Sequence, residues 1–447
     1  MKKKLVSRGL SLVLAGALLT GCAQGAAPSE TGSKSEAAET AGAEETVTIE
    51  LMHDEAEEDR IKALQEIIDA FMAENPDITV KQLPVSEDGF ETKVKTLISG
   101  GEMPALVASS ASLMQMLDEE EMINTAANKE VVEEFGRDKF YDQILQMLNS
   151  TDGEGMIGVP ITAWVSGIWY RKDLFEEKGL KAPETWEDIL TAAKAFHDPA
   201  GKMYGILFGT EESAVSQQNF QMIAGSNGAE LFDADGKPQF NSPEMKEAMA
   251  FYKDLYQYTL PGSNGVTQIR DAMVGGNTAM CTFSSYIMGP LYRAGMADKI
   301  GYCVPKNKNG AVFGSPSTYT ISNTITPQET EAAKKFITWL LNDDMNIKLL
   351  HIAPGGPNPV LKSVAENPEY TSADVLKAYG EEAKKVPAAF DSLKVFGTQN
   401  GVTNPSAGSI INAMIIGKTI NQILVQGQDL DEAMDKAQAD MEKIVNR

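Results

Sequence analysis

The 447-residue sequence contains few of the residues that most catalytic and metal sites require. It has only three cysteines and three histidines, and no histidine stands at metal-ligand spacing from a cysteine or from another histidine. It contains no G-x-S-x-G, P-loop, G-x-G-x-x-G or H-E-x-x-H motif. These absences disfavour metal-dependent, nucleotide-dependent and serine-hydrolase chemistry. We therefore expect neither a catalytic site nor a cofactor.

Basic residues are also scarce, because 39 Lys and Arg stand against 63 Asp and Glu, a formal charge of −24. Such a charge repels nucleic acids and anionic lipid surfaces, so we expect no nucleic-acid partner. The many acids leave open a carboxylate pair of the kind used in glycoside hydrolysis, although no motif supports one.

Cysteine usage leaves one structural question open. Cys281 and Cys303 lie in two short strand-like runs, TAMCTF and GYCVP. In an exported protein they would form a disulfide if the two strands were neighbours, but the sequence does not give the distance between them.

The longest apolar run near the N-terminus, Leu10–Leu19, follows a basic segment and is too short to span a bilayer. Leu19–Cys22 (LTGC) then resembles a bacterial lipobox. Residues 1–21 are predicted to be a lipoprotein signal peptide, with Cys22 as the lipidated residue carrying acyl chains such as palmitate. The plain alternative is a secretory signal followed by a coincidental cysteine.

The mature chain would begin at Cys22 with 35 basic and 63 acidic residues, a net charge of −28. Residues 22–46 consist mainly of Ala, Gly, Ser, Thr and Glu, which predicts a flexible acidic tether. We expect the protein to be held by its lipid anchor at the outer face of the cell membrane, outside the cytoplasm.

Strand-like and helix-like patterns alternate beyond this tether. Val47–Met52 is rich in β-branched residues, and Glu58–Glu74 carries apolar residues at helical spacing. This alternation predicts an α/β fold with mostly parallel sheets. Leu231–Asn241 has Asp and Gly residues as in a calcium loop, but Leu231 and Ser242 fall where carboxylate ligands are needed, so we predict a hairpin instead.

Gly158–Phe175 (GVPITAWVSGIWYRKDLF) is an apolar extended run that contains Trp164 and leads into a helix. Pro160 fixes one φ and removes a hydrogen-bond donor, so it belongs at a strand start, a sheet edge or a crossing between lobes. Taken alone, the stretch also fits an ordinary strand followed by a helix.

Several segments, in this order along the chain, resemble the family 1 extracellular solute-binding proteins, the maltose-binding-protein-like receptors of ABC importers. Ala105 departs from the pattern, because the family often has an acid there. The resemblance covers residues 47–447 and rests on residues 74–80 (ENPDITV), 158–175, 183–188 (PETWED), 273–282 (MVGGNTAMCT), 330–341 (TEAAKKFITWLL) and 354–359 (PGGPNP).

The resemblance implies a periplasmic-binding-protein-like fold of two lobes, each with a central, mostly parallel sheet, joined by a hinge. It assigns residues 47–161 and 317–365 to lobe 1 and residues 162–316 and 366–447 to lobe 2. It further implies a monomer that captures a carbohydrate, most simply an oligosaccharide, in the interlobe cleft. The ligand would pass to ABC permease subunits and, through them, depend on an ATPase.

Candidate ligand contacts lie at predicted strand ends, because ligands of open α/β sheets bind beyond the carboxyl ends of the strands. Sugar hydroxyls need polar partners, and the apolar face of a sugar ring needs a flat aromatic ring. On the resemblance, Trp164 falls where maltose receptors place a ligand-touching side chain, and Tyr286 falls where the family commonly has a tryptophan. The expected contacts are His53, Asp54, Glu55, Ser109, Ser110, Trp164, Gln217, Gln218, Ser285, Tyr286, Ser315 and Ser317.

Alternative interpretations remain at this level. The same fold would suit a polyamine, a metal chelate or a phosphorylated solute, and a sensory protein would present its ligand to a membrane receptor instead of a permease. The candidate loops contain no Arg or Lys, which disfavours an anionic ligand, whereas His53, Asp54 and Glu55 would suit a cation.

Overall fold

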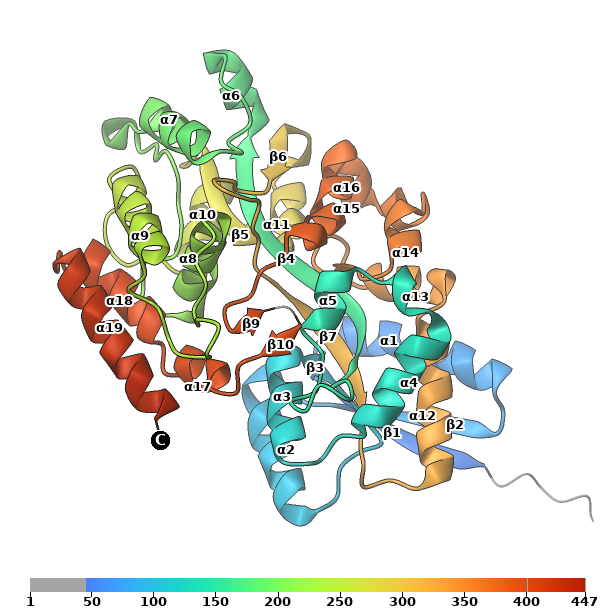
Figure 1. Cartoon of the computed structure of the whole chain (residues 1–447). Coiled ribbons are helices and arrows are strands. Elements are labelled where there is room, and N and C mark those ends of the chain that lie inside the picture. The colour runs from blue at the N-terminus through green and yellow to red at the C-terminus, as the bar shows by residue number, and fades with distance from the viewer. Residues whose placement is uncertain (1–45, 400, 447) are drawn as a thin grey trace, which may run out of the picture. The chain divides into compact units, whose positions relative to one another are not determined.

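The first strands of the fold form a parallel arrangement in the computed structural model, which describes residues 46–399 and 401–446 (Figure 1). Strand β1 (Val47–His53) pairs in parallel with β2 (Ile78–Pro84) on one side and with β3 (Leu106–Ser110) on the other. Helix α1 (Glu58–Glu74) connects β1 to β2. It buries apolar side chains one turn apart, as its spacing predicts: Leu64, Ile67, Ile68 and Phe71.

Two long strands connect this sheet to the rest of the fold. Residues Val159–Val165 of β4 (Val159–Arg171) pair antiparallel with β7 (Gly314–Ile321), which also pairs with β3. The second half of β4 pairs with β5 (Met280–Ser284) along one edge and with β6 (Ile300–Cys303) along the other. The strand order is therefore β2-β1-β3-β7-β4-β5, and β4 continues from one region of the fold into the other.

The directions of the strands differ from the expectation of mostly parallel sheets. Parallel pairing joins β1 to β2 and to β3, whereas the described pairings of β4 and β7 are antiparallel. The reason is that β7 returns between β3 and β4 and runs opposite to both. Repeated strand–helix connections favour parallel pairing between neighbouring strands. Here β7 lies between β3 and β4 and pairs antiparallel with both.

Two hydrophobic cores lie along β4. The first core takes side chains from β1, β3 and α1 and from these helices: α2 (Glu87–Gly100), α3 (Ala111–Glu119), α4 (Thr125–Phe135), α5 (Asp142–Gln146), α10 (Val266–Val274), α11 (Met288–Arg293), α12 (Pro327–Leu340), α13 (Asp343–Leu350), α14 (Lys362–Glu366), α15 (Asp374–Tyr379) and α16 (Glu381–Ala388).

The second core is formed mainly by helices. It contains side chains of α6 (Lys172–Lys178), α7 (Trp186–Phe196), α8 (Ala214–Ser226), α9 (Pro243–Tyr256), α17 (Ala407–Asn412), α18 (Ile415–Leu424) and α19 (Leu430–Val445). Strands β8 (Asn358–Pro359), β9 (Thr398–Gln399) and β10 (Val402–Thr403) are short. The side chains of Leu376 and Ala383 join the first core, although the predicted boundary places them in lobe 2.

Local residue chemistry explains a helix start in the structure, and the hairpin predicted at Leu231–Asn241 is confirmed. Thr185 is the N-cap of α7, and its side-chain oxygen accepts a hydrogen bond from the Asp188 backbone N–H. At the predicted hairpin, Phe232 pairs with Pro238, and Gly236 adopts a φ of +77°, which its missing Cβ permits.

The two cysteines beyond the tether are buried and free, and they do not lie on neighbouring strands. Cys281 in β5 is paired with Trp169 of β4, whereas Cys303 in β6 is paired with Ile168 on the opposite edge of β4. Two strand spacings separate β5 from β6, about 10 Å, which is beyond disulfide reach. Burial raises the pKa of both thiols well above the ordinary value. The disulfide that the sequence left open is therefore excluded.

The crossing strand also depends on a glycine. A Cβ atom at Gly167 of β4 would lie 2.3 Å from the Tyr302 ring, which is buried and stacks near Trp169 with ring centroids 4.8 Å apart. The Tyr302 hydroxyl donates to the Ser166 carbonyl at 2.9 Å, so the ring cannot move without losing this hydrogen bond.

We predict that Gly167→Ala lowers the free energy of unfolding by about 1–3 kcal/mol, the usual cost of overpacking. Gly408→Ala in α17 is the matched control. No atom lies within 4 Å of its added Cβ, and alanine favours a helix, so stability should rise slightly. Chemical denaturation compares the two variants. Equal effects of both substitutions would contradict the close packing at Gly167.

Candidate functional site

One face of the crossing strands gathers several of the predicted ligand-binding residues. Trp164 of β4 lies opposite Ser315 of β7, and Ser317 lies opposite both Thr162 of β4 and Ser110 of β3. Directly paired residues project from the same face of a sheet, as do residues two apart along one strand. Ser110, Thr162, Trp164, Ser315 and Ser317 therefore share one face, which we call the crossing face.

Most residues of the crossing face are accessible, whereas the opposite face of the same strands is packed. Trp164, Ser315 and Ser317 are partly exposed and Ser110 is exposed, but Thr162 is buried, as are the intervening Ala163 and Pro316. Beside them, the Trp164 ring packs edge-on against Phe313, with ring centroids 5.3 Å apart. The tryptophan thus keeps part of its surface open while its contact with Phe313 holds the ring in position.

Charged residues follow the carboxyl end of β1, in the loop to α1 and in the first turn of that helix. Arg60, in the first turn of α1, donates through Nη1 to Glu55 Oε2 at 2.6 Å, and its Nε lies 3.8 Å from Glu57 Oε2. Burial disfavours the charged guanidinium, but the hydrogen bond to Glu55 and the charges of Glu55, Glu57 and Tyr286 outweigh burial. The pKa of Arg60 is therefore raised above its ordinary value.

Tyr319 connects these charges to the crossing face. It lies two residues beyond Ser317 on β7, so its side chain projects from the same face of the sheet. Burial raises the pKa of its hydroxyl, and the nearby charges of Glu55 and Asp54 raise that pKa further. Asp54 also accepts a hydrogen bond from the Ser109 hydroxyl at 3.4 Å.

Tyr286 lies near the same charged group but comes from a different region of the chain. It follows β5 in a short helical turn, is 42% exposed, and contributes to the field at Arg60. Its ring lies so close to Gly356 that a Cβ atom there would be 2.6 Å from Tyr286 Cε1. Segments far apart in the sequence therefore bring two partly exposed aromatic rings, serine hydroxyls and a carboxylate–guanidinium pair into one neighbourhood.

Three predicted contacts are buried and hydrogen-bonded within the fold. His53 is buried, its Nε2 lies 3.1 Å from Gln82 Oε1, and burial lowers its pKa. Gln217 is buried and donates to the Ile411 carbonyl at 3.2 Å, while the fully buried Ser285 donates to the Gly356 carbonyl at 2.5 Å. Gln218 is partly exposed on α8.

Sequence reasoning missed Arg60, Tyr319 and Phe313 as members of this neighbourhood. Arg60 was overlooked because only loop residues were considered as cations, although it stands five residues after Glu55, within the first turn of the next helix. Its short separation from a strand end was the available signal. Tyr319 and Phe313 can be recognised as members of this neighbourhood only when the pairing of β4 with β7 is known. No local sequence pattern predicts that pairing.

The model of the family of bacterial extracellular solute-binding proteins matches residues 55–347 of this chain. The chain belongs to this family. It is 34% identical over 401 residues to YcjN of Escherichia coli (strain K12), named as an ABC transporter periplasmic-binding protein, covering 90% of this chain and 93% of YcjN. It is 26% identical over 312 residues to the mannitol-binding protein of Pseudomonas aeruginosa, covering 66% of this chain and 68% of that protein.

The fold is that of the two-lobed solute-binding proteins. The structure of the sugar-binding protein MalE from Xanthomonas citri superimposes with a TM-score of 0.75 at 18% identity, covering 90% of this chain and 98% of that chain. The expected fold class is thereby confirmed. The protein is a solute-binding protein of an ABC transporter, and such proteins bind small molecules and deliver them to permease components.

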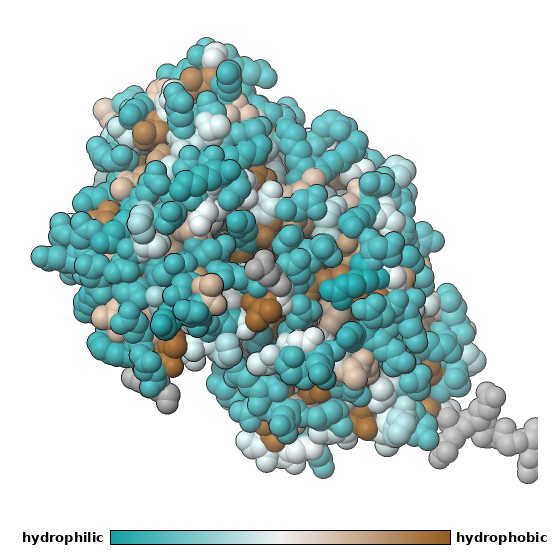
Figure 2. Space-filling model, viewed as in Figure 1, coloured by the Kyte–Doolittle hydropathy of each residue, from teal (hydrophilic) through white to brown (hydrophobic). Residues whose placement is uncertain are grey.

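The described surface is consistent with an extracellular binding protein. Figure 2 shows a mostly hydrophilic face on which hydrophobic residues form small separate groups. Within residues 46–399 and 401–446, no helix is long and apolar enough to cross a membrane. The family consists of transport-associated binding proteins and not of enzymes.

Proposed function

We propose that the protein binds a neutral carbohydrate at the crossing face and delivers it to its ABC permease. The observation that carries this proposal is the partly exposed Trp164, which lies opposite Ser315 on the face that Ser317 shares. An indole face accepts the apolar side of a sugar ring, and serine hydroxyls both donate to and accept from sugar hydroxyls.

The local charges favour a neutral ligand over an anion. Arg60 is the cation of this neighbourhood, but Glu55 and Glu57 lie within 4 Å of it and Asp54 follows directly after β1. A phosphorylated solute would have to displace these carboxylates from the guanidinium. A cationic solute such as a polyamine remains the alternative, because these carboxylates outnumber the guanidinium.

Two classes of carbohydrate ligand, which differ in size, are candidates. An oligosaccharide is the first candidate, in keeping with the likeness in fold to the sugar-binding protein MalE. A sugar alcohol is the second, because one relative is a mannitol-binding protein and a similar structure holds ribitol. Both classes present many hydroxyls, so the crossing face serves either.

The experiment that tests the proposal is a thermal-shift screen followed by calorimetry. The screen should contain maltooligosaccharides, monosaccharides, sugar alcohols, polyamines and sugar phosphates. A neutral carbohydrate should raise the melting temperature, because a ligand that binds only the folded state stabilises it. Stabilisation by polyamines alone, or by sugar phosphates alone, would contradict the proposal.

The anchoring of the protein is a second part of the proposal. Residues 1–45 lie outside the described residues, so the lipobox at Leu19–Cys22 is judged from sequence alone. We propose that the monomeric mature chain is tethered through acyl chains on Cys22 and that its two lobes, at about the predicted boundaries, close on the ligand. Hinge closure of this kind is how two-lobed receptors commonly enclose a solute.

Cys22→Ser should abolish incorporation of labelled palmitate and release the protein from the membrane fraction. Cys303→Ser is the matched control, because that thiol is buried within the fold and should not affect lipidation. Palmitate incorporation that survives in the Cys22→Ser variant would contradict the lipobox interpretation.

For the ligand found in the screen, Trp164→Ala should weaken binding by about 2 kcal/mol, roughly thirtyfold, as truncation of aromatic anchors commonly does. Trp339→Ala is the matched control, because Trp339 is also partly exposed and packs against an aromatic ring, with its centroid 5.5 Å from that of Phe71. Calorimetry should show unchanged affinity for this control. Unchanged affinity of Trp164→Ala, together with a large loss of stability, would make Trp164 a packing residue only.

A further inference from the structure

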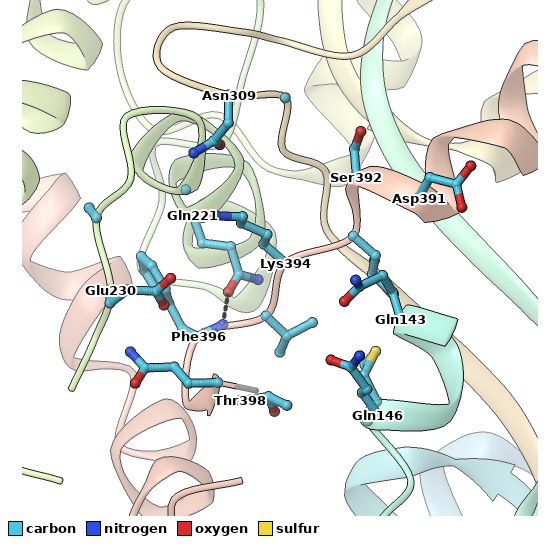
Figure 3. A pocket seen from close by; sticks show the side chains of 17 residues that line it. Gln143, Gln146, Gln221, Glu230, Asn309, Asp391, Ser392, Lys394, Phe396 and Thr398 are labelled. Carbon is cyan, nitrogen blue, oxygen red and sulfur yellow. Dashed lines mark hydrogen bonds between the residues drawn. The ribbon is translucent and has the colours of Figure 1, made fainter. Parts of the chain in front are cut away.

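A cavity of about 830 Å³ lies away from the crossing face (Figure 3). Gln143 and Gln146 of α5 line one side, Gln221 of α8 lines another, and residues 391–396 with Thr398 and Gln399 complete the wall. None of the residues of the crossing face lines it. Its volume falls within the range of small-molecule binding sites in proteins.

The cavity and the crossing face lie on opposite sides of the crossing strands. Leu393 lines the cavity, and its Cδ1 would be 3.0 Å from a Cβ atom on Gly314 of β7. Gly314 precedes Ser315, and neighbouring residues in a strand project from opposite faces. A ligand in this cavity would therefore be separated by the strands from a ligand at Trp164.

The cavity wall contains a buried polar group with unused hydrogen-bonding capacity. The Gln221 side chain is only 6% exposed, and its Oε1 accepts from the Phe396 backbone N–H at 2.8 Å. Among the described residues, none accepts a hydrogen bond from its Nε2. This amide N–H is available in the cavity to a ligand that accepts hydrogen bonds.

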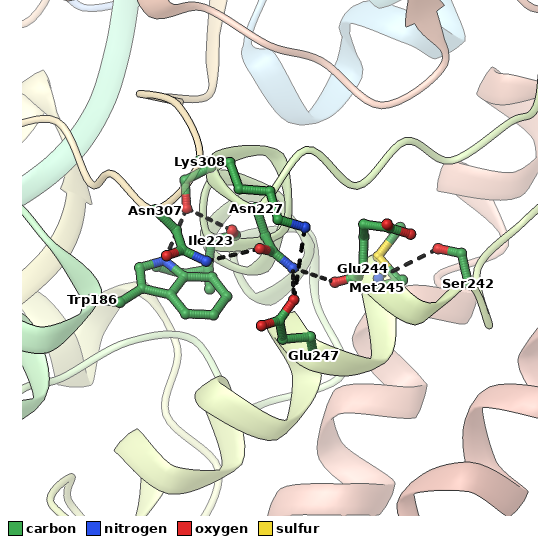
Figure 4. A network of polar contacts seen from close by, with 10 residues as sticks. Trp186, Ile223, Asn227, Ser242, Glu244, Met245, Glu247, Asn307 and Lys308 are labelled. Atoms are coloured by element: carbon green, nitrogen blue, oxygen red, sulfur yellow. Dashed lines mark hydrogen bonds and ion pairs between the residues drawn. The ribbon is translucent and has the colours of Figure 1, made fainter.

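The rim of the cavity is held in place by a polar network, which Figure 4 shows. The backbone N–H groups of Lys308 and Asn309 donate to the Ser226 carbonyl at 2.9 and 3.1 Å, at the C-terminus of α8. Asn307 donates to Asn227 at 2.8 Å, and Asn227 in turn donates to Glu247 at 2.9 Å. The loop that carries Asn309 and Gly310 to the cavity is thus fixed before any ligand arrives.

The opposite part of the wall is also tied to the core. The Val312 N–H donates to the Ser392 carbonyl at 3.0 Å, and the Lys394 N–H donates to the Val312 carbonyl at 2.9 Å. These bonds hold Ser392 and Lys394 beside Val312, with Leu393 between them in an extended conformation. A site whose walls are positioned in this way loses little entropy on binding.

The chemistry of the lining favours uncharged, hydroxyl-rich compounds. Side-chain amides predominate, and each amide both donates and accepts, as a hydroxyl group does. Lys394 has no carboxylate within 4.0 Å among the described residues, and Glu230 and Asp391 also line the cavity. With charges of both signs and a small local excess of negative charge, the cavity favours neither a strong anion nor a strong cation.

We propose that this cavity is a second binding site, for a small neutral polyol, distinct from the transport site at the crossing face. The site uses the amides of α5 and α8 and the backbone of residues 391–396. This inference does not depend on which ligand binds at Trp164.

The test uses the full chain carrying Trp164→Ala, which weakens the crossing face. Calorimetric titrations with glycerol, xylitol, D-mannitol and myo-inositol should show binding of at least one of these probes. Adding Gln143→Trp, which fills the cavity from α5, should weaken that binding at least tenfold. Gln328→Trp, on an exposed position of α12, is the matched control and should leave it unchanged.

Gln221→Met provides a second variant that keeps the side-chain length but removes the amide, and it should weaken probe binding by about tenfold. Absence of binding of all four probes to the Trp164→Ala chain would overturn the proposal. Binding that persists unchanged in both Gln143→Trp and Gln221→Met would overturn it as well. Loss of the transport ligand in Trp164→Ala alone tests the crossing face separately, so failures of the two proposals are distinguishable.

Discussion

The antiparallel pairing of β4 with β7 is the constraint on which the rest of the structure depends. β4 is 13 residues long, and its first half pairs with β7 while its second half pairs with β5 and β6. The register between β4 and β7 therefore determines which side chains of the two strands share the crossing face. A slip of β4 by one residue against β7 would bury Trp164 and expose Ala163, because neighbouring residues of a strand project from opposite faces.

The same pairing separates two kinds of surface. The crossing face presents an indole ring and serine hydroxyls, and it adjoins the Glu55–Arg60 ion pair and Tyr319. The other face packs against Leu393 and leads to the amide-lined cavity. The fold thus places an aromatic, partly charged site and an amide-rich site on the two sides of the strands that join its cores.

Features that depend on neighbouring residues could be predicted from the sequence. The hairpin turn at Gly236 and the spacing of apolar residues in α1 each involve fewer than twenty residues, and each is confirmed. Several short segments that resemble the family, in the same order along the chain, were enough to indicate it. The role of Trp164 stays a prediction that its position now supports.

Features that depend on pairing between distant segments could not be predicted. The returning β7 made the described β4 and β7 pairings antiparallel, and β4 separates Cys281 from Cys303. His53 is a polar residue at a strand end, yet α1 and β2 bury it beside Gln82. Arg60 became part of the site because the first turn of α1 lies against the end of β1, and its short separation from that strand end was the one signal in the sequence.

Hydrogen–deuterium exchange with and without the transported ligand tests the central claim most directly, because it reports on every segment of the folded chain at once. If the ligand binds at the crossing face, saturating ligand should slow exchange in residues 54–60, 109–112, 162–166, 285–287 and 314–318. Residues 143–147 and 391–396 should change less, since they lie on the other side of the crossing strands. Protection confined to residues 143–147 and 391–396 would contradict the account, because it would place the transported ligand in the amide-lined cavity.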